Sequence, residues 1–270
     1  GGRQHVGLCR GPEVSLIVLQ GRLISPGDAW MSGPGCVGRM LAAWILEILA
    51  HRQPWRDQNA AFVGHHMENL LYWAGMLAVA VNALTGVLDA GRKHMDLIGV
   101  VMVGAATALG GGTVRDVLLQ RPVFWVSDQI YLIVALATTL VIFFAVRGLR
   151  LPPRLFLIPD ALGLALFTIV GTQIALEWHA PWLVASLLGV ITGVVGGVLR
   201  DVLCNEVPLI FVRGELYASA AWAGALVLVG LQALSVSPVI AAWAGMVAVL
   251  GIRLAAMAFR IALPTYSARE

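Results

Sequence analysis

The chain has 270 residues, of which 59% are hydrophobic and 12% charged, and its mean hydropathy is +0.84. Soluble proteins carry roughly 25% charged residues, so this composition indicates an integral membrane protein. The net charge of +3 is explained by arginines beside lipid headgroups, and it does not imply a nucleic-acid partner.

Residues 1–66 differ from the rest of the chain. They contain 14 glycine or proline residues, and their longest uncharged run, Ala29–Gly38, is too short to cross a membrane. The segment also lacks the basic and apolar regions of a signal peptide. We expect it to be an extension outside the fold, with Met67 as the natural start.

Seven membrane spans are predicted from Met67 onward. A helical crossing needs about 20 mostly apolar residues. The last uncharged run, Leu216–Ile252, is long enough for two crossings, divided by a turn that ends at Pro238. Five further runs lack acidic and basic residues: Leu70–Leu88, Leu97–Val114, Gln129–Val146, Ala161–Leu176 and Ala180–Leu199.

One motif occurs twice. GGTVRDVL fills Gly111–Leu118, and GGVLRDVL fills Gly196–Leu203, 85 positions later. Other positions match at the same offset: Leu77/Leu162, Ala80/Ala165, Gly86/Gly171, Gly104/Gly189 and Thr107/Thr192. After one inserted residue the offset is 86, and Pro122/Pro208, Val126/Val212 and Tyr131/Tyr217 match. The chain is therefore built from two copies of one unit.

The copies predict an all-α membrane protein with an inverted repeat. Residues 67–152 form the first three-helix unit, residues 153–236 the second, and residues 237–270 a seventh helix with a tail. Because three is an odd number of crossings, the second unit enters the membrane from the opposite side, as in many secondary transporters.

The orientation follows from the basic residues. Apart from the motif arginines and the N-terminal segment, one side has Arg121 alone. The other side, predicted to be cytoplasmic by the positive-inside rule, holds Arg92, Lys93, Arg147, Arg150, Arg154, Arg213, Arg260 and Arg269. The first span then starts outside, and the C-terminus is cytoplasmic.

Glycine clusters precede both motif arginines. Consecutive glycines weaken a helix by about 1 kcal/mol each relative to alanine. Kinks or breaks are therefore predicted in the second and fifth spans, at Gly110, Gly111 and Gly112 and at Gly193, Gly196 and Gly197. A break would line a cavity, and its free helix N-terminus would attract an anion. The alternative is that the glycines only allow close helix packing.

Arg115 and Arg200 follow the clusters within apolar runs. An arginine near the bilayer centre costs at least about 2.5–3.5 kcal/mol, so both are expected to face the protein interior or a water path. The alternative is that they extend to the interface as topology anchors. Since the two spans run in opposite directions, the arginines are candidate outer and inner gates.

Asp116 and Asp201 adjoin the arginines. Neighbours at i and i+1 do not face each other on a helix, so each aspartate is expected either to pair with another helix or to contact substrate. Further polar side chains in the first and fourth spans are expected to make interhelical hydrogen bonds: Asn82, Thr85, Thr168, Thr172 and Gln173.

No signature of catalysis is present. The motif lacks the GK[ST] ending of a phosphate-binding loop, and neither HExxH nor GxSxG occurs. Cys9, Cys36 and Cys204 have no metal-ligand spacing. We therefore predict no enzyme activity, no cofactor and no metal site.

The sequence resembles a known family of membrane proteins. AGRKHMDLIGV at Ala90–Val100, ALGGGTVRDVLL, PVFWV, GVITGVVGGVLRDVL, NEVPLIF and ELYASAA are similar to the bacterial glycine transporter domain family. The resemblance covers Met67 to about Pro264. One departure is that the second copy reads VGG where the first reads GGG.

That family in turn resembles the TRIC cation channels. The resemblance implies seven spans, kinked second and fifth helices, and a trimer with one pathway per subunit. It also implies which residues line the pathway: Gly110, Gly111, Gly112, Arg115, Gly196, Gly197 and Arg200. It does not decide between a carrier and a channel.

These features predict an inner-membrane transporter of a small zwitterion, with glycine as the expected substrate. Helix N-termini at the glycine breaks, with Arg115 or Arg200, are expected to hold the carboxylate. Backbone carbonyls, or Asp116 and Asp201, are expected to hold the ammonium group. The alternatives are a monovalent cation channel like TRIC and a purely structural membrane scaffold.

Overall fold

The computed structural model describes residues 17–19, 22–24, 65–148, 156–212, 216–259 and 261. The chain divides into two units, Gly1–Val63 and Gly64–Glu270. In the first unit, β1 (Ile17–Leu19) pairs antiparallel with β2 (Arg22–Ile24). Several residues named above lie outside the described ranges: Cys9, Cys36, Arg150, Arg154, Arg213, Arg260 and Arg269.

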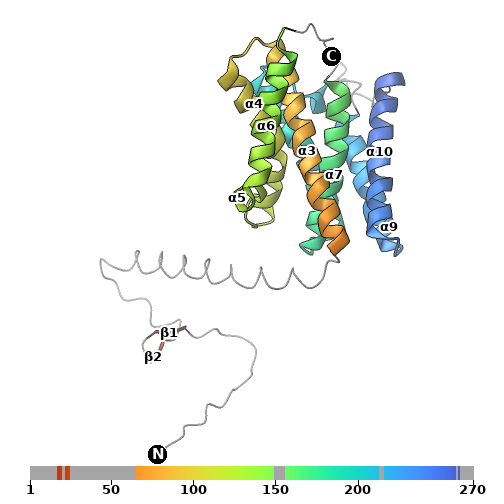
Figure 1. Cartoon of the computed structure of the whole chain (residues 1–270). Helices are drawn as coiled ribbons and strands as arrows, with labels where there is room; N and C mark the ends of the chain where they lie inside the picture. The colour runs from red at the N-terminus through yellow and green to blue at the C-terminus, as the bar shows by residue number, and fades with distance from the viewer. Residues whose placement is uncertain are drawn as a thin grey trace, which may run out of the picture. The chain divides into compact units, whose positions relative to one another are not determined.

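The second unit is a bundle of helices (Figure 1). Its long helices are α3 (His65–Arg92), α4 (Leu97–Leu118), α6 (Gln129–Val146), α7 (Leu157–Glu177), α8 (Trp182–Leu203), α9 (Tyr217–Ala233) and α10 (Pro238–Phe259). Short elements follow the two motif helices: α5 (Phe124–Ser127) and η2 (Leu209–Phe211). Among the described residues six helices are long and apolar enough to cross a membrane, and α9 is a shorter apolar helix. The predicted all-α fold with seven spans is confirmed.

Local signals define the helix ends. The carboxylate of Asp96 accepts a hydrogen bond from Gly99 N at 2.8 Å, and that of Asp128 accepts one from Ile130 N at 3.0 Å, so each caps a helix start. Five helices are followed by a residue with positive φ, as is common at helix C-termini: His94, Gln120, His179, Asn205 and Ser235. Four of these form two pairs at the same place in the two repeats: His94 with His179, and Gln120 with Asn205.

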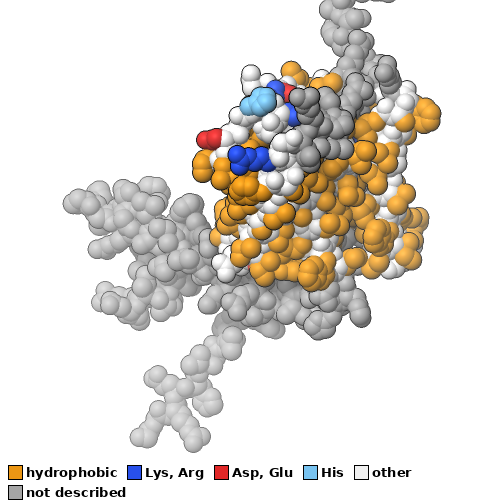
Figure 2. All heavy atoms as spheres, turned by 45° about the horizontal axis from the view of Figure 1, so that its top comes forward, with side chains coloured by type: hydrophobic (Ala, Val, Ile, Leu, Met, Phe, Trp, Pro, Cys, Tyr) orange, Lys and Arg blue, Asp and Glu red, His pale blue; other side chains and the backbone are white. Residues whose placement is uncertain are grey.

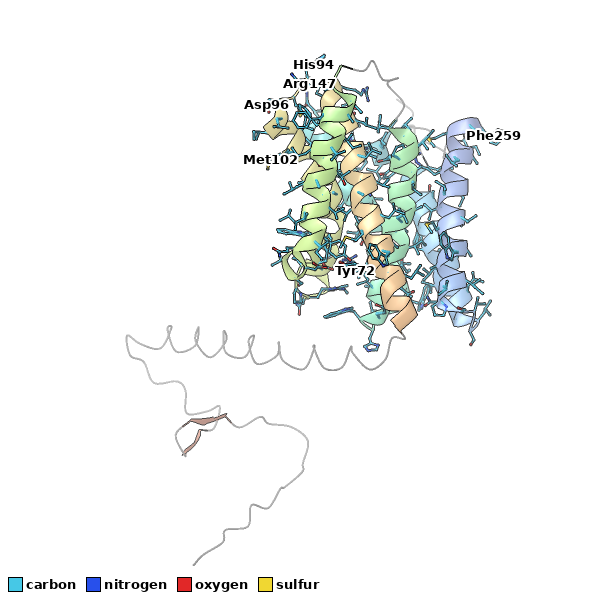
Figure 3. All side chains as sticks on the ribbon, in the orientation of Figure 1. Tyr72, His94, Asp96, Met102, Arg147 and Phe259 are labelled. Atoms are coloured by element: carbon cyan, nitrogen blue, oxygen red, sulfur yellow. The ribbon has the colours of Figure 1, made fainter. Side chains whose placement is uncertain are left out.

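The two repeats run in opposite directions. Tyr72, near the start of α3, donates a hydrogen bond to Asp128 at 3.2 Å, and the opposite end of the bundle carries His94 and Arg147 (Figure 3). Phe156, just before α7, lies under the Arg92 guanidinium at 5.5 Å, so α7 begins where α3 ends. The first helices of the two repeats, α3 and α7, are therefore antiparallel, which confirms the inverted repeat.

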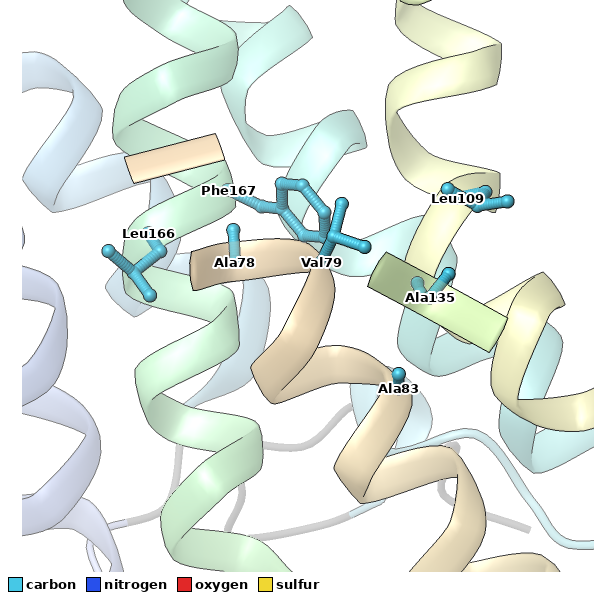
Figure 4. Close-up of a cluster of buried hydrophobic side chains, with 8 residues drawn as sticks. Ala78, Val79, Ala83, Leu109, Ala135, Leu166 and Phe167 are labelled. Carbon is cyan, nitrogen blue, oxygen red and sulfur yellow. The ribbon is translucent and has the colours of Figure 1, made fainter. Parts of the chain in front are cut away.

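The outer surface and the core are both apolar. On the face shown in Figure 2, charged and histidine side chains gather at one end, and the flank is hydrophobic. Inside, a cluster joins α3, α4, α6 and α7 through Val79, Leu109, Ala135 and Phe167 (Figure 4). Such a surface suits a lipid environment, because lipid tails are as apolar as the side chains that face them.

Candidate functional site

Helices α4 and α8 carry the repeated motif and remain α-helical through their glycine clusters. The expected break, with a free helix N-terminus inside the membrane, is therefore wrong for both helices. The physical reason is packing, because burial against a neighbouring helix offsets the low intrinsic helix propensity of glycine. A bend without a break is compatible with these continuous helices.

The central glycines pack α4 and α8 against each other. A Cβ added at Gly111 would overlap the carbonyl oxygen of Thr192, and one added at Gly196 would overlap that of Thr107. The two threonine hydroxyls donate to carbonyls of their own helices, each at 2.6 Å. The inverted repeat therefore places one close backbone contact on each side of the crossing, as small residues allow in membranes.

The other motif glycines face side chains. A Cβ at Gly112 would lie 2.5 Å from the ring of Phe124, and one at the matching Gly197 would lie 2.7 Å from the Tyr217 hydroxyl. A Cβ at Gly110 would meet the flexible end of Leu199. In this structure the clusters therefore serve packing, and their role in lining a pathway stays a prediction.

Both motif arginines are buried. Arg115 is 3% exposed and Arg200 is 0% exposed, so neither reaches out to the lipid headgroups as a topology anchor. In each motif, arginine Nε donates a hydrogen bond of 2.8 Å to Oδ1 of the next residue, Asp116 or Asp201. The expectation that adjacent arginine and aspartate side chains do not meet is wrong.

Their position at the helix end explains this pairing. Both aspartates lie in the last turn of a helix, where the carboxylate turns toward the following segment. Oδ2 of Asp116 accepts a hydrogen bond from Phe124 N, and Oδ2 of Asp201 accepts one from Leu209 N, each at 2.8 Å. The long arginine side chain bends toward the carboxylate held there, so the two neighbours meet although i, i+1 side chains do not face each other along a regular helix.

The direct partners of Arg115 and Asp116 are residues close in sequence. The guanidinium lies over the Phe124 ring at 5.8 Å. Arg121 Nε approaches Asp116 Oδ1 at 3.4 Å, and the Arg121 guanidinium lies over the ring of Trp178 at 5.1 Å. Asp116 is therefore shared by two guanidinium groups.

The Arg200 centre connects four helices. Arg200 Nη1 donates to Oδ1 of Asp160 at 2.6 Å, and its Nε lies 3.7 Å from Oδ2 of Asp89. The Tyr217 hydroxyl also donates to Asp160 Oδ1, at 3.2 Å, and the Phe156 ring lies 5.1 Å from the guanidinium. Contacts from α3, α7, α8 and α9, and from the residue before α7, thus converge on one buried arginine.

Sequence reasoning missed Asp89 and Asp160. Each stands at the edge of an uncharged run, where an acidic residue is interpreted only as the end of a span. Neither has a charged counterpart in the other repeat, so a comparison of the two copies does not identify them. A useful signal is that both acids fall on the side predicted to be rich in arginine.

Most of the polar side chains in α3 and α7 bond within their own helix. Asn82 donates to Ala78 O at 2.8 Å, and Thr172 donates to Thr168 O at 2.8 Å. Gln173 does reach another helix, because its Oε1 accepts from Gln232 Nε2 at 2.6 Å. The expectation of interhelical hydrogen bonds therefore holds for Gln173 and is wrong for Asn82, Thr172 and Thr85, which donates to Asn82 O at 2.8 Å.

Two groups lie just outside the spans near the Arg200 centre. Lys93 Nζ is 2.7 Å from Glu206 Oε1, and this hydrogen bond raises the pKa of Lys93. Burial, together with the negative charge of Asp89, raises the pKa of Cys204 to about 12. Cys204 packs among apolar residues such as Val103, and it is a free, buried thiol.

Within the part of the chain that the structure describes, no group of three or more His, Cys, Asp or Glu residues is placed to hold a metal.

Known proteins resemble this chain along most of its second unit. The UPF0126 inner membrane protein YadS of Escherichia coli K12 is 44% identical over 204 residues, which cover 74% of this chain and 98% of that protein. A UPF0126 membrane protein of Vibrio cholerae is 41% identical, covering 74% of this chain and 84% of the relative.

TRIC cation channels are among the solved structures that resemble this chain. The TRIC trimeric intracellular cation channel orthologue from Rhodobacter sphaeroides superimposes with a TM-score of 0.68 at 37% identity, covering 71% of this chain and 99% of that one. A prokaryotic TRIC channel in 0.5 M KCl superimposes with a TM-score of 0.66 at 25% identity, covering 73% of this chain and 100% of that one.

The two repeats also match a protein family. The family described as "Glycine transporter" matches residues 72–147 and again residues 157–233. Each match contains one copy of the glycine, arginine and aspartate motif. The relatives belong to a transporter and channel family, and the six long apolar helices indicate a multi-pass membrane protein. The chain belongs to the glycine transporter family of membrane proteins.

Proposed function

We propose that this protein carries a small zwitterionic amino acid, with glycine as the substrate, across the bacterial inner membrane. The observation that supports this most directly is the pair of buried arginines, 3% and 0% exposed, at opposite ends of two inverted helices. Buried charges within the membrane are costly and usually mark substrate or ion pathways. The route runs between α4 and α8, past Arg115 and Arg200.

The arginines supply the charge that a substrate carboxylate needs. A guanidinium can bind a carboxylate through two parallel hydrogen bonds. In this structure Nε and Nη2 of each arginine instead both lie 2.8 Å from a single oxygen, Oδ1 of Asp116 or Asp201. A substrate carboxylate therefore exchanges with these aspartates for the same donors. Carbonyl oxygens along the crossing, or the displaced aspartates, accept from the ammonium group.

Glycine is the amino acid that fits this route. The backbones of α4 and α8 touch at Gly111 and Gly196, so a passing molecule has to separate the helices. A substrate without a side chain requires the smallest separation. The Arg115 and Arg200 centres then act as gates at the two ends, the first on the outer side and the second on the cytoplasmic side.

A monovalent cation channel is the second candidate. It is supported by the similarity to solved TRIC cation channels at 37% and 33% identity. The word "trimeric" in the description of the Rhodobacter sphaeroides protein also supports a homotrimer for this chain.

Flux measurements in proteoliposomes separate the two functions. A carrier shows saturable uptake of radiolabelled glycine that alanine and serine compete for, whereas a channel gives unitary K⁺ currents with little chemical selectivity. Arg115→Ala should reduce glycine uptake at least tenfold, because it removes a charge-assisted contact to the carboxylate. Unchanged uptake in a folded variant would contradict the pathway, and absence of both activities would favour a membrane scaffold.

A further inference from the structure

The centre around Arg200 has two carboxylates that the other centre lacks. Asp160 comes from α7 and Asp89 from α3, and both lie against the same guanidinium, at 2.6 Å and 3.7 Å. The positions related to them by the 85-residue offset are Gly75 and Ile174, which carry no charge. The inverted repeat is therefore chemically asymmetric at one of its two ends.

Each of these carboxylates has one oxygen without a hydrogen bond among the described residues. Oδ1 of Asp160 accepts from both Arg200 and Tyr217, but its Oδ2 accepts none. Oδ1 of Asp89 accepts from Arg92 at 3.1 Å, but its Oδ2 accepts none. Asp89 is 0% exposed and Asp160 is 1% exposed, so bulk water does not replace the missing donors. Buried carboxylate oxygens without donors are unusual and call for an explanation.

The neighbouring aspartate shows that this is not a general property of the motif. In Asp201 one oxygen accepts from Arg200 and the other from Leu209 N. Other charged or ionisable groups lie near the two open oxygens. Arg92, Lys93, Cys204 and Glu206 are near Asp89. Tyr217 on α9 is beside Asp160, and its ring lies 4.9 Å from the Arg253 guanidinium of α10.

We propose that Asp160 Oδ2 and Asp89 Oδ2 bind a monovalent cationic group during transport. In the main case, which rests on the proposed function, this group is the ammonium of the zwitterion, and the substrate carboxylate binds Arg200. A zwitterion inserted between Arg200 and Asp160 replaces one ion pair with two and adds no net charge to the buried site. A bare K⁺ ion makes the same contacts with the two oxygens but adds a positive charge.

The test measures equilibrium binding to the full chain in lipid nanodiscs. Asp160→Asn removes the charge while keeping the size of the side chain. Asp128→Asn is the matched control, because Asp128 lies at the opposite end of the bundle and accepts from Tyr72 and Ile130 N. We expect Asp160→Asn to weaken glycine binding about tenfold or more, the effect of losing a charge-assisted hydrogen bond. The control should stay within about twofold of wild type.

Competition identifies which cationic group binds. Methylammonium should displace glycine from the wild type and from Asp128→Asn, and it should do so poorly from Asp160→Asn. If the wild type binds no glycine but its K⁺ conductance saturates, and Asp160→Asn raises the half-saturating K⁺ concentration, the site is upheld and the amino-acid substrate is rejected. If Asp160→Asn and Asp89→Asn both leave glycine binding and K⁺ saturation unchanged, the cation site is overturned.

Labelling of the wild-type protein tests the site without a substitution that could prevent folding. A hydrophobic carbodiimide followed by peptide mass spectrometry reports the modification rates of Asp160 and Asp128 in one sample. Glycine, methylammonium or KCl should slow modification of Asp160 and leave Asp128 unchanged. Equal rates at Asp160 with and without all three would overturn the proposal.

Discussion

At the scale of single residues, the two motif arginines differ in what their loss would leave unpaired. Arg200→Ala would leave both Asp160 and Asp201 buried without this guanidinium, a change that costs about 3–5 kcal/mol when one partner of a buried pair is removed. Arg115→Ala would leave Asp116, which keeps Arg121 at 3.4 Å. Thermal unfolding of the purified proteins in detergent should therefore show the larger drop in Tm for Arg200→Ala. Equal drops would mean that the contacts from α3 and α7 add nothing to stability.

Cys204 allows a second test at this scale. The thiolate is the form that reacts with iodoacetamide, and burial raises the pKa of Cys204 to about 12. Alkylation of the folded protein at pH 8 should therefore be at least a hundredfold slower than alkylation in SDS. Since the pKa is raised, the thiolate fraction grows about tenfold for each pH unit up to pH 12, and the folded protein loses stability as pH rises above the ordinary thiol pKa. Peptide mass spectrometry separates Cys204 from Cys9 and Cys36, and equal rates in the two states would contradict its burial.

Sequence alone predicted the burial of Arg115 and Arg200, because charge in an apolar run is costly unless it faces inward. It did not predict their pairing with the adjacent aspartates, because the rule for neighbouring positions assumes a helix that continues. It also missed Asp160, whose partner Arg200 is 40 residues away. Contacts of that range depend on tertiary packing, which no local pattern encodes.

At the scale of helices, the crossing of α4 and α8 depends on two glycines. A Cβ at Gly111 or Gly196 would overlap a backbone carbonyl, which cannot rotate away as a side chain can. Gly111→Ala and Gly196→Ala should each destabilise the protein by roughly 1–3 kcal/mol, the usual cost of overpacking.

Two other helical glycines provide controls for this prediction. Apart from the backbone of its own helix, no heavy atom of the described residues lies within 4 Å of a Cβ added at Gly230 in α9 or at Gly251 in α10. Alanine at either position should be neutral or should stabilise the helix by up to about 1 kcal/mol. The measurement is thermal unfolding of the four variants side by side. If all four lower Tm equally, close packing at the crossing is not what the motif glycines provide.

The long helices were predictable because run length and a turn-forming proline mark them. The start of α10 at Pro238 is where the sequence places it. The short elements α5 and η2 were not predicted, because four and three residues carry no periodic pattern. Their backbone N–H groups nevertheless fix Asp116 and Asp201, so one unpredicted part of the site lies in the least regular segments.

At the scale of the whole molecule, duplication accounts for the paired centres and divergence accounts for their difference. The same 2.8 Å contacts occur at both ends, since both copies keep the arginine, the aspartate and the amide eight residues after it. The extra carboxylates occur only beside Arg200. A carrier with two identical ends would have no built-in preference between its inward-open and outward-open states, so under the proposed function we expect this asymmetry to set their relative stability.

The orientation in the membrane is the last prediction. Arg92, Lys93 and Arg147 lie at the end of the bundle that carries His94, and positive charge near span ends favours the cytoplasm. Alkaline phosphatase is active only outside the inner membrane, so fusions after Ser127 or His179 should be active. Fusions after His94 or Gly148 should be inactive, and green fluorescent protein at these two positions should fluoresce because it folds in the cytoplasm. The reverse pattern would place the Arg200 centre outside, and the proposed gates would exchange roles.

Because the positive-inside rule acts through these basic side chains, replacing Arg92, Lys93 and Arg147 by glutamine should produce a population of proteins in both orientations, with phosphatase activity appearing in fusions after His94.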